Sequence, residues 1–126
     1  MANPNIVAVT SILGKTDYLT PANTSANVLL TNAASSGTVL KINQIVAANV
    51  DGTSATNCTV TLNSAAAGGG TAYPIVSTVS VPADASLIVT DKTTAIYLEE
   101  NRSIVVTSGS ANDLSFTISY EIISSS

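Results

Sequence analysis

The stretch that decides the fold, residues 79–108, reads VSVPADASLIVTDKTTAIYLEENRSIVVTS. It alternates short runs of β-branched, aliphatic and aromatic residues with tight-turn sequences. The apolar runs are 87–89, 96–98 and 104–106, and the turns are 82–84, 91–92 and 99–102. This composition is typical of short strands on a half-buried pleated surface. The stretch therefore predicts several consecutive strands without an intervening helix.

The remainder of the chain continues the same pattern. Further strands are predicted at 6–13, ended by Gly14, and at 18–19, 26–31, 38–50, 55–62, 73–81 and 114–122. No ten-residue window keeps the apolar i, i+3, i+4, i+7 stripe of a helix. Turn signals every 8–12 residues or so favour an antiparallel β-sandwich. We predict an all-β, jelly-roll-like sandwich of about 8–10 short strands with no significant helix.

Two strands carry explicit predictions about which side chains share one face. The last strand alternates cleanly and places Leu114, Phe116, Ile118, Tyr120 and Ile122 on one face. In the run 38–50 the same rule groups Leu40, Ile42, Val46, Ala48 and Val50, with Gln44 as the exception. The turn signal Asp51-Gly52 predicts a hairpin that joins this run to 55–62.

Length and composition bound the size and surface of the domain. The 126 residues predict one domain over 6–123, with an N-terminal arm at 1–5 and a frayed tail at 124–126. Only 10% of the residues are charged, against about 25% in average globular proteins, while Ser and Thr supply about a quarter. Because hydroxyls cost less to desolvate than ions, such a surface is suited to protein contacts.

Several function classes are disfavoured by the same residues. A net charge of −4 with four scattered basic residues argues against nucleic-acid binding. The short apolar runs argue against a membrane span, and the first residues lack the features of a signal peptide. The chain has no histidine and one cysteine, Cys58, which strand alternation predicts to be buried. We therefore predict no enzyme activity, no metal site and no cofactor.

One acidic pair offers an alternative reading as a calcium site. Glu99-Glu100 lies in a turn, where it could combine with Asp84 or Asp91 around an oxygen-seeking ion. The sequence lacks the spacing of a calcium-binding loop. The preferred interpretation is a solvated turn with Arg102 nearby.

Three groups of residues are candidates for contacts with a partner. The first is the arm, with Asn3, Pro4 and Asn5. The second is the glycine run Gly68, Gly69 and Gly70, either a mobile loop that orders on a partner or a plain hairpin loop. The third is the pair Tyr73 and Tyr97, of which Tyr97 is expected to point outward from its strand.

Two long segments resemble a known protein family. MANPNIVAVTSILGKT at 1–16 and STVSVPADASLIVTDKTTAIYLEENRSIVVTSG at 77–109 are similar to small virion structural proteins of tailed phages that infect marine cyanobacteria. VPADASLIV, TAIYLEEN and RSIVVTS carry this resemblance. In that family we expect glycine at the position of Asn101 and an acidic residue at that of Arg102.

The resemblance implies a component of the virion without catalytic residues, made in the host cytoplasm. It favours a head decoration (cement) protein at the capsid surface that clamps the major capsid protein lattice. Such a protein would be a homo-oligomer, for which a trimer is plausible by analogy. One alternative is a neck, tail or fibre-associated β-domain. Another is a carbohydrate-binding or other binding module.

Overall fold

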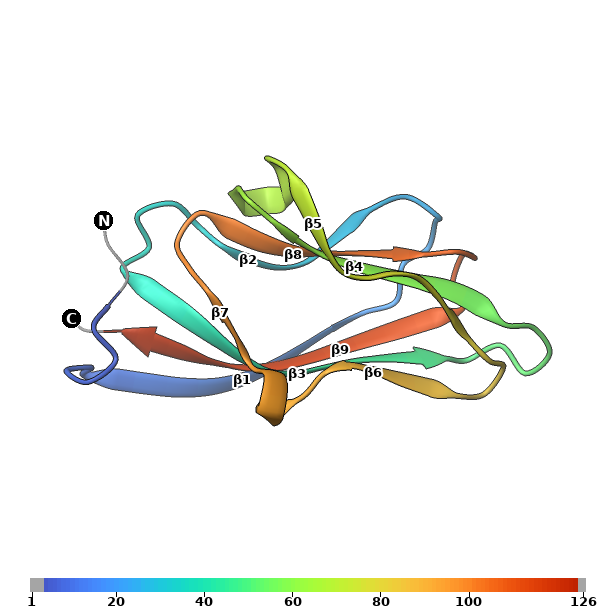
Figure 1. The fold of residues 1–126 in the computed structure, drawn as a ribbon, viewed down its shortest axis with the longest axis horizontal. Helices are drawn as coiled ribbons and strands as arrows, with labels where there is room; N and C mark the ends of the chain where they lie inside the picture. Colours follow the sequence, from blue (N-terminus) through green and yellow to red (C-terminus); the bar gives the residue numbers. More distant parts are fainter. Residues whose placement is uncertain (1–3, 125–126) are drawn as a thin grey trace.

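In the computed structural model, which describes residues 4–124, the chain forms two antiparallel sheets packed face to face (Figure 1). Sheet A contains β1 (Ser11–Leu19), β3 (Thr38–Asn49), β6 (Ser86–Thr90), β7 (Ile96–Leu98) and β9 (Leu114–Ser124). Sheet B contains β2 (Asn27–Asn32), β4 (Thr56–Asn63), β5 (Ala72–Val81) and β8 (Arg102–Ser108). The helical segments of the described part are two three-residue 3-10 turns, η1 (Ala66–Gly68) and η2 (Lys92–Thr94).

The order of the strands is that of a jelly roll. Sheet A runs β1-β9-β3-β6, with β7 pairing β3 beside β6, and sheet B runs β2-β8-β4-β5. Most connections cross from one sheet to the other, so that neighbouring strands in a sheet are not consecutive in sequence, except for the hairpin of β4 and β5. Two interleaved Greek keys of this kind define the jelly roll. The predicted all-β sandwich is confirmed, and the nine strands found in residues 4–124 lie within the predicted range.

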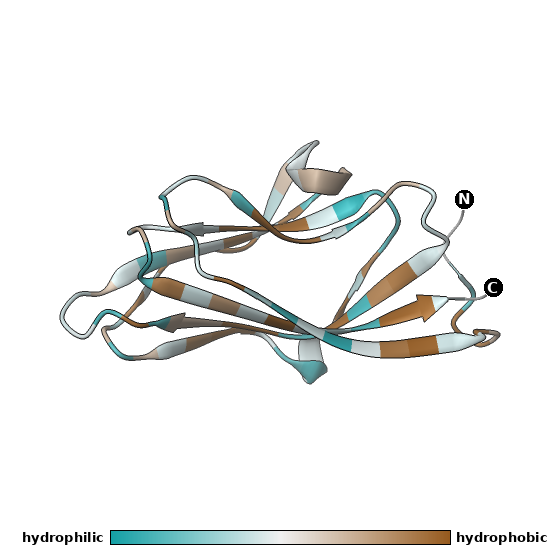
Figure 2. Ribbon diagram, turned by 180° about the vertical axis from the view of Figure 1, so that it is seen from behind, coloured by the Kyte–Doolittle hydropathy of each residue, from teal (hydrophilic) through white to brown (hydrophobic). Residues whose placement is uncertain are grey.

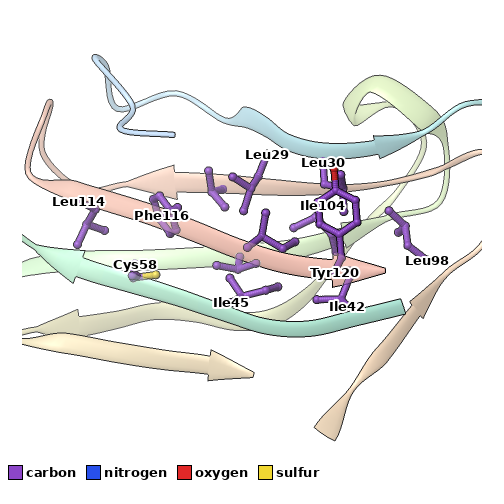
Figure 3. Close-up of a cluster of buried hydrophobic side chains, with 14 of the residues drawn as sticks. Leu29, Leu30, Ile42, Ile45, Cys58, Leu98, Ile104, Leu114, Phe116 and Tyr120 are labelled. Atoms are coloured by element: carbon purple, nitrogen blue, oxygen red, sulfur yellow. The ribbon is translucent and has the colours of Figure 1, made fainter. Parts of the chain in front are cut away.

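The core lies between the sheets and is built largely from the inward faces of β3, β8 and β9. Figure 3 shows Phe116 and Leu114 of β9 among side chains of both sheets, with Ile42 and Ile45 from β3 and Ile104 from β8. The predicted alternation of β9 is confirmed from Leu114 to Tyr120, which are buried, and Ile122 is partly buried against the same core. Burial of these branched and aromatic side chains supplies the main driving force for folding.

The predicted faces of β3 are wrong beyond its midpoint because the strand contains a bulge. The pairing with β9 shifts between Ile42 and Gln44, which leaves one extra residue, Asn43, in the ladder. An extra residue reverses which side chains face inward. Ile45 and Ala47 are therefore fully buried, whereas the residues predicted to share the face of Ile42, namely Val46, Ala48 and Val50, are not.

The hairpin predicted at Asp51-Gly52 is also wrong. The turn is present, but it leads from β3 in sheet A to β4 in sheet B, and the two strands do not pair. Both edges of β3 are already occupied, by β9 on one side and by β6 and β7 on the other. Asn49, at the end of β3, stabilises this connection between the two sheets. Its side chain donates hydrogen bonds to the carbonyls of Ser54 and Val81, each 2.9 Å long.

The first strand begins later and runs further than the sequence predicts. Residues 6–10 form turns and bends, and β1 continues through Gly14 to Leu19 as one strand rather than two. Gly14 does not interrupt the strand because it stays in the ladder opposite Glu121 of β9. The other predicted strands coincide with observed ones to within a few residues at each end.

Candidate interaction surfaces

No cluster of side chains suited to metal binding is found in the described part of the chain. Across residues 4–124, His, Cys, Asp and Glu side chains form no group of three that could hold a metal ion. Glu100 accepts a hydrogen bond from the backbone of Gly37, and Arg102 donates to the carbonyls of Ser64 and Asn101. These contacts fix the link from β7 to β8. In the same range, no helix has the length and apolar character needed to cross a bilayer.

The N-terminal segment and β7 form an apolar pocket on the outer face of sheet A. The pocket has a volume of about 280 Å³ and is lined by Pro4, Ile6, Val39, Tyr97 and Glu99. Val39 points away from the core, yet it is buried as deeply as a core residue. The structure thus brings together two predicted contact residues, Pro4 and Tyr97, and we call this region the arm pocket.

The backbone next to the arm pocket is held in a turn by Asn5. Its side chain accepts a hydrogen bond from the Val7 amide, and its carbonyl accepts one from the Ala8 amide, both 3.0 Å long. Asn5 itself is exposed, so its outer surface is available to a partner. Asn3, the remaining candidate of the arm, lies outside the described residues. Ile6 and Val39 were missed because each resembles an ordinary strand residue in sequence.

The glycine run belongs to a loop that is hydrogen-bonded to its own domain. The Ala67 amide donates to Thr31 of β2, and the Gly68 amide donates to Ser103 of β8, both 2.9 Å long. The loop therefore packs against sheet B, as a hairpin loop between β4 and β5. Tyr73 lies close by on β5 and is exposed. The candidates thus fall into two regions on different sheets, the arm pocket and this β4–β5 loop.

Substituting Gly70 with alanine is expected to cost about 2 kcal/mol in the free energy of unfolding. Gly70 has φ of +70°, and an added Cβ would come within 2.3 Å of the Ser64 hydroxyl and 2.9 Å of the Ala65 nitrogen. Urea unfolding measures the change. Gly52→Ala is the matched control, since its Cβ would meet Asp84 at an ordinary 3.7 Å. Equal stability of the two variants would contradict the observed loop conformation.

A second, polar pocket lies on sheet A around η2. It has a volume of about 420 Å³ and is lined by Asn43, Gln44, Asp91, Lys92 and Ser119. Hydrogen bonds from the Thr93 hydroxyl and amide lower the pKa of Asp91. The same hydrogen bonds make its carboxylate the N-cap of the 3-10 turn.

Cys58 is fully buried, as predicted, and its thiol is protected by the fold. Burial raises its pKa to about 11. Burial, followed by the hydrogen bond to Asp17, likewise raises the pKa of Tyr120 to about 12. For both side chains the folded state favours the protonated form. At a pH between the pKa of the unfolded chain and the raised pKa of the folded chain, the unfolded chain ionises and the free energy of unfolding falls.

The resulting pH dependence has a defined direction. We expect the melting temperature to be insensitive to these two groups below about pH 9 and to fall as the pH rises from there to about 12. Over the lower part of that pH range, the melting temperature of the Cys58→Ala variant should fall less steeply than that of the wild-type chain. Thermal melts at stepped pH test this, and a thiol reagent should label the native protein at pH 8 only as fast as it unfolds. Rapid labelling of the native state would contradict the burial.

Comparison with known proteins supports the fold but does not assign a sequence family. No family model matches the sequence, and no curated protein matches it. A chain of the acidic stable capsid structure of Helicobacter pylori bacteriophage KHP30 aligns with a TM-score of 0.53 at 11% identity, over 94% of this chain and 91% of that chain. The two chains therefore share a fold over nearly their whole lengths.

A second alignment is looser. A chain from the structure of the Gx strain of infectious bursal disease virus covers 88% of this chain but only 33% of its own length, with 12% identity and a TM-score of 0.44. At that score the overlap does not define a shared fold.

Proposed function

We propose that this chain is a structural protein of a phage virion, and specifically a head decoration (cement) protein that binds the major capsid protein lattice. The observation that carries the proposal is the end-to-end alignment with a chain of the KHP30 capsid. In both proteins one domain of this fold accounts for nearly the whole aligned chain. The sequence resemblance to small virion proteins of cyanobacterial phages points to the same class of protein.

The surface of the domain suits this role. Few side chains carry a charge, and Ser and Thr are abundant on the exposed faces of the strands. A partner protein can cover such a surface at low desolvation cost. Weak contacts of this kind add through avidity when many copies bind one shell.

We assign the lattice contact to the arm pocket and its surroundings. Pro4 and Ile6 present apolar side chains beside Tyr97, whose ring is partly exposed. Aromatic residues next to an apolar pocket are frequent anchors at protein interfaces. Asn5 would flank this contact, and Asn3 is retained as a contact candidate from the sequence alone. Gly68, Gly69, Gly70 and Tyr73 of the β4–β5 loop would form a second contact from sheet B.

The proposal places the chain on the capsid surface, after synthesis in the host cytoplasm. Its partners would be the major capsid protein and further copies of itself. A location at the neck, tail or fibre would use the same fold with a different neighbour. Quantification of the chain in purified particles separates these two locations.

Quantitative mass spectrometry of separated heads and tails tests the proposal. We expect the chain in heads, at a copy number comparable with that of the major capsid protein. A few copies that leave with the tails would overturn the decoration role in favour of the neck or tail. Binding to heads that lack the chain should be weakened by Tyr97→Ala, and Val50→Ala is a control on an exposed apolar residue far from the arm pocket.

A further inference from the structure

The edges of the two sheets differ in how well they are protected against pairing with another chain. Three of the four edges formed by residues 4–124 carry recognised protective features. The edge of sheet A at β6 and β7 is split into two short strands by η2. In sheet B, β5 contains Pro74 and two register shifts, and β2 has a shift between Val28 and Leu30 with η1 hydrogen-bonded against it.

The fourth edge, β1, has no break, no register shift and no proline, and its protective features are the charged residues Lys15 and Asp17. It is nine residues long and pairs with β9 in one unbroken register from Ser11 to Leu19. Within the described residues, β9 is the only strand with which it pairs. Its other edge therefore presents backbone donors and acceptors along an uninterrupted strand, which is a template for strand addition.

The side chains of β1 are unusually apolar and exposed for an edge strand. Ile12 is 54% exposed, Leu13 58% and Tyr18 80%, so apolar groups project on both faces of the strand. Figure 2 shows this hydrophobic colouring along the first half of β1, beside the ends of the chain. Exposed apolar groups along an open strand edge mark an interaction surface.

We infer that β1 pairs in antiparallel fashion with β1 of a second copy of this chain, about a two-fold axis at Thr16. In that register Lys15 of each copy lies opposite Asp17 of the other. Residues directly opposite in an antiparallel pair share a face of the sheet. Lys15 and Asp17 both lie on the inner face of β1, opposite Tyr120 and Ile118 of β9. The two-fold thus creates two cross-strand ion pairs.

In the same register, further side chains of the two β1 strands are complementary. Tyr18 of one copy lies opposite Gly14 of the other on the outer face, and Leu13 lies opposite Leu19 on the inner face. A Cβ at Gly14 would meet nothing within 4 Å, so there is room for the tyrosine ring. An aromatic residue across from an edge glycine covers the backbone that glycine leaves open.

This self-complementarity is the reason for choosing a second copy as the occupant. A lysine on an edge strand normally discourages pairing. Here Asp17, two residues after Lys15, has the opposite charge. Only a two-fold axis at Thr16 places Lys15 of each copy opposite Asp17 of the other. The inference does not depend on the capsid role, because it concerns the isolated chain.

Disulfide trapping tests the register directly. The Thr16→Cys variant places two thiols across the proposed axis, where opposed Cα atoms of paired strands are within disulfide range. Because the native Cys58 is fully buried, the new thiol is the only exposed one among the described residues. Under a mild oxidant we expect a disulfide-linked dimer. Ser80→Cys, on the exposed part of β5, is the matched control and should form no disulfide-linked dimer.

Charge reversal tests the partner. Sedimentation of the wild-type chain over a concentration series should reach twice the monomer mass of 12.7 kDa. Lys15→Asp should raise the dissociation constant about tenfold, because both ion pairs become repulsive. Asp17→Lys should do the same, and an equimolar mixture of the two variants should form a heterodimer in which both pairs are restored.

The outcomes that overturn the inference are equally specific. A monomer at every concentration, a trimer, or equal cross-linking at residues 16 and 80 would each refute pairing through β1. Asp17 also accepts a hydrogen bond from Tyr120, so Asp17→Lys is used only if its melting transition is retained. If that variant does not fold, Lys15→Asp and Thr16→Cys decide the question without it.

Discussion

Replacing Phe116 with alanine is expected to lower the free energy of unfolding by about 3–5 kcal/mol. Phe116 is fully buried in the middle of the core, where β9 packs against the opposite sheet. Truncation removes the transfer free energy of the ring and leaves a cavity that the rigid strands around it cannot fill. The measurement is urea unfolding followed by fluorescence or circular dichroism.

The control for this variant is Tyr73→Ala, which truncates an aromatic residue that is exposed on β5. Its effect should stay within about 0.5 kcal/mol. A loss below about 1 kcal/mol for Phe116→Ala would be inconsistent with a core centred on β9.

The second large effect is expected at Asn49, where Asn49→Ala should cost about 3 kcal/mol. Its amide donates to the Ser54 and Val81 carbonyls at 2.9 Å, and its oxygen accepts from the Asp51 amide at the same distance. The side chain is buried, so its removal leaves buried backbone groups without partners. These bonds fix the passage from sheet A to sheet B, and their loss should weaken the whole sandwich.

The same unfolding assay tests this prediction, with Asn43→Ala as the comparison. Asn43 sits in the bulge of β3, and its amide donates to Glu121 at 3.1 Å while its oxygen has no hydrogen-bond partner. Its removal should cost clearly less than that of Asn49. If both variants lose the same free energy, the special role of Asn49 in the crossing is disproved.

The fold class was accessible from the sequence because it depends on local signals. Alternation in β9 placed Phe116 and Tyr120 in the core, and each apolar run between turn residues became a strand. Cys58 and the outward position of Tyr97 followed from the same two-residue period.

The errors arose where pairing between distant segments decides the structure. The bulge at Asn43 is set by the register with β9, which no local pattern reveals. The turn at Asp51-Gly52 has hairpin chemistry, yet β3 has no free edge for β4 to join. Gly14 was predicted to end the first strand, but its pairing with Glu121 of β9 keeps it within β1.

The candidate site was only partly predictable for a related reason. Sequence reasoning selected Pro4 and Tyr97 separately, and the structure places them in one pocket with Ile6 and Val39. Tyr73 and the glycine run were selected in the same way, yet they lie on the other sheet. Which outer surfaces adjoin one another depends on the topology of the jelly roll, and single-residue patterns do not encode it.

The measurement that tests the central claim most directly is cryo-electron microscopy of the phage particle that carries this chain. We predict density for the jelly roll repeated over the icosahedral shell, with the arm pocket against several capsid subunits. Density confined to the portal vertex or tail, or absent from the particle, would contradict the decoration role.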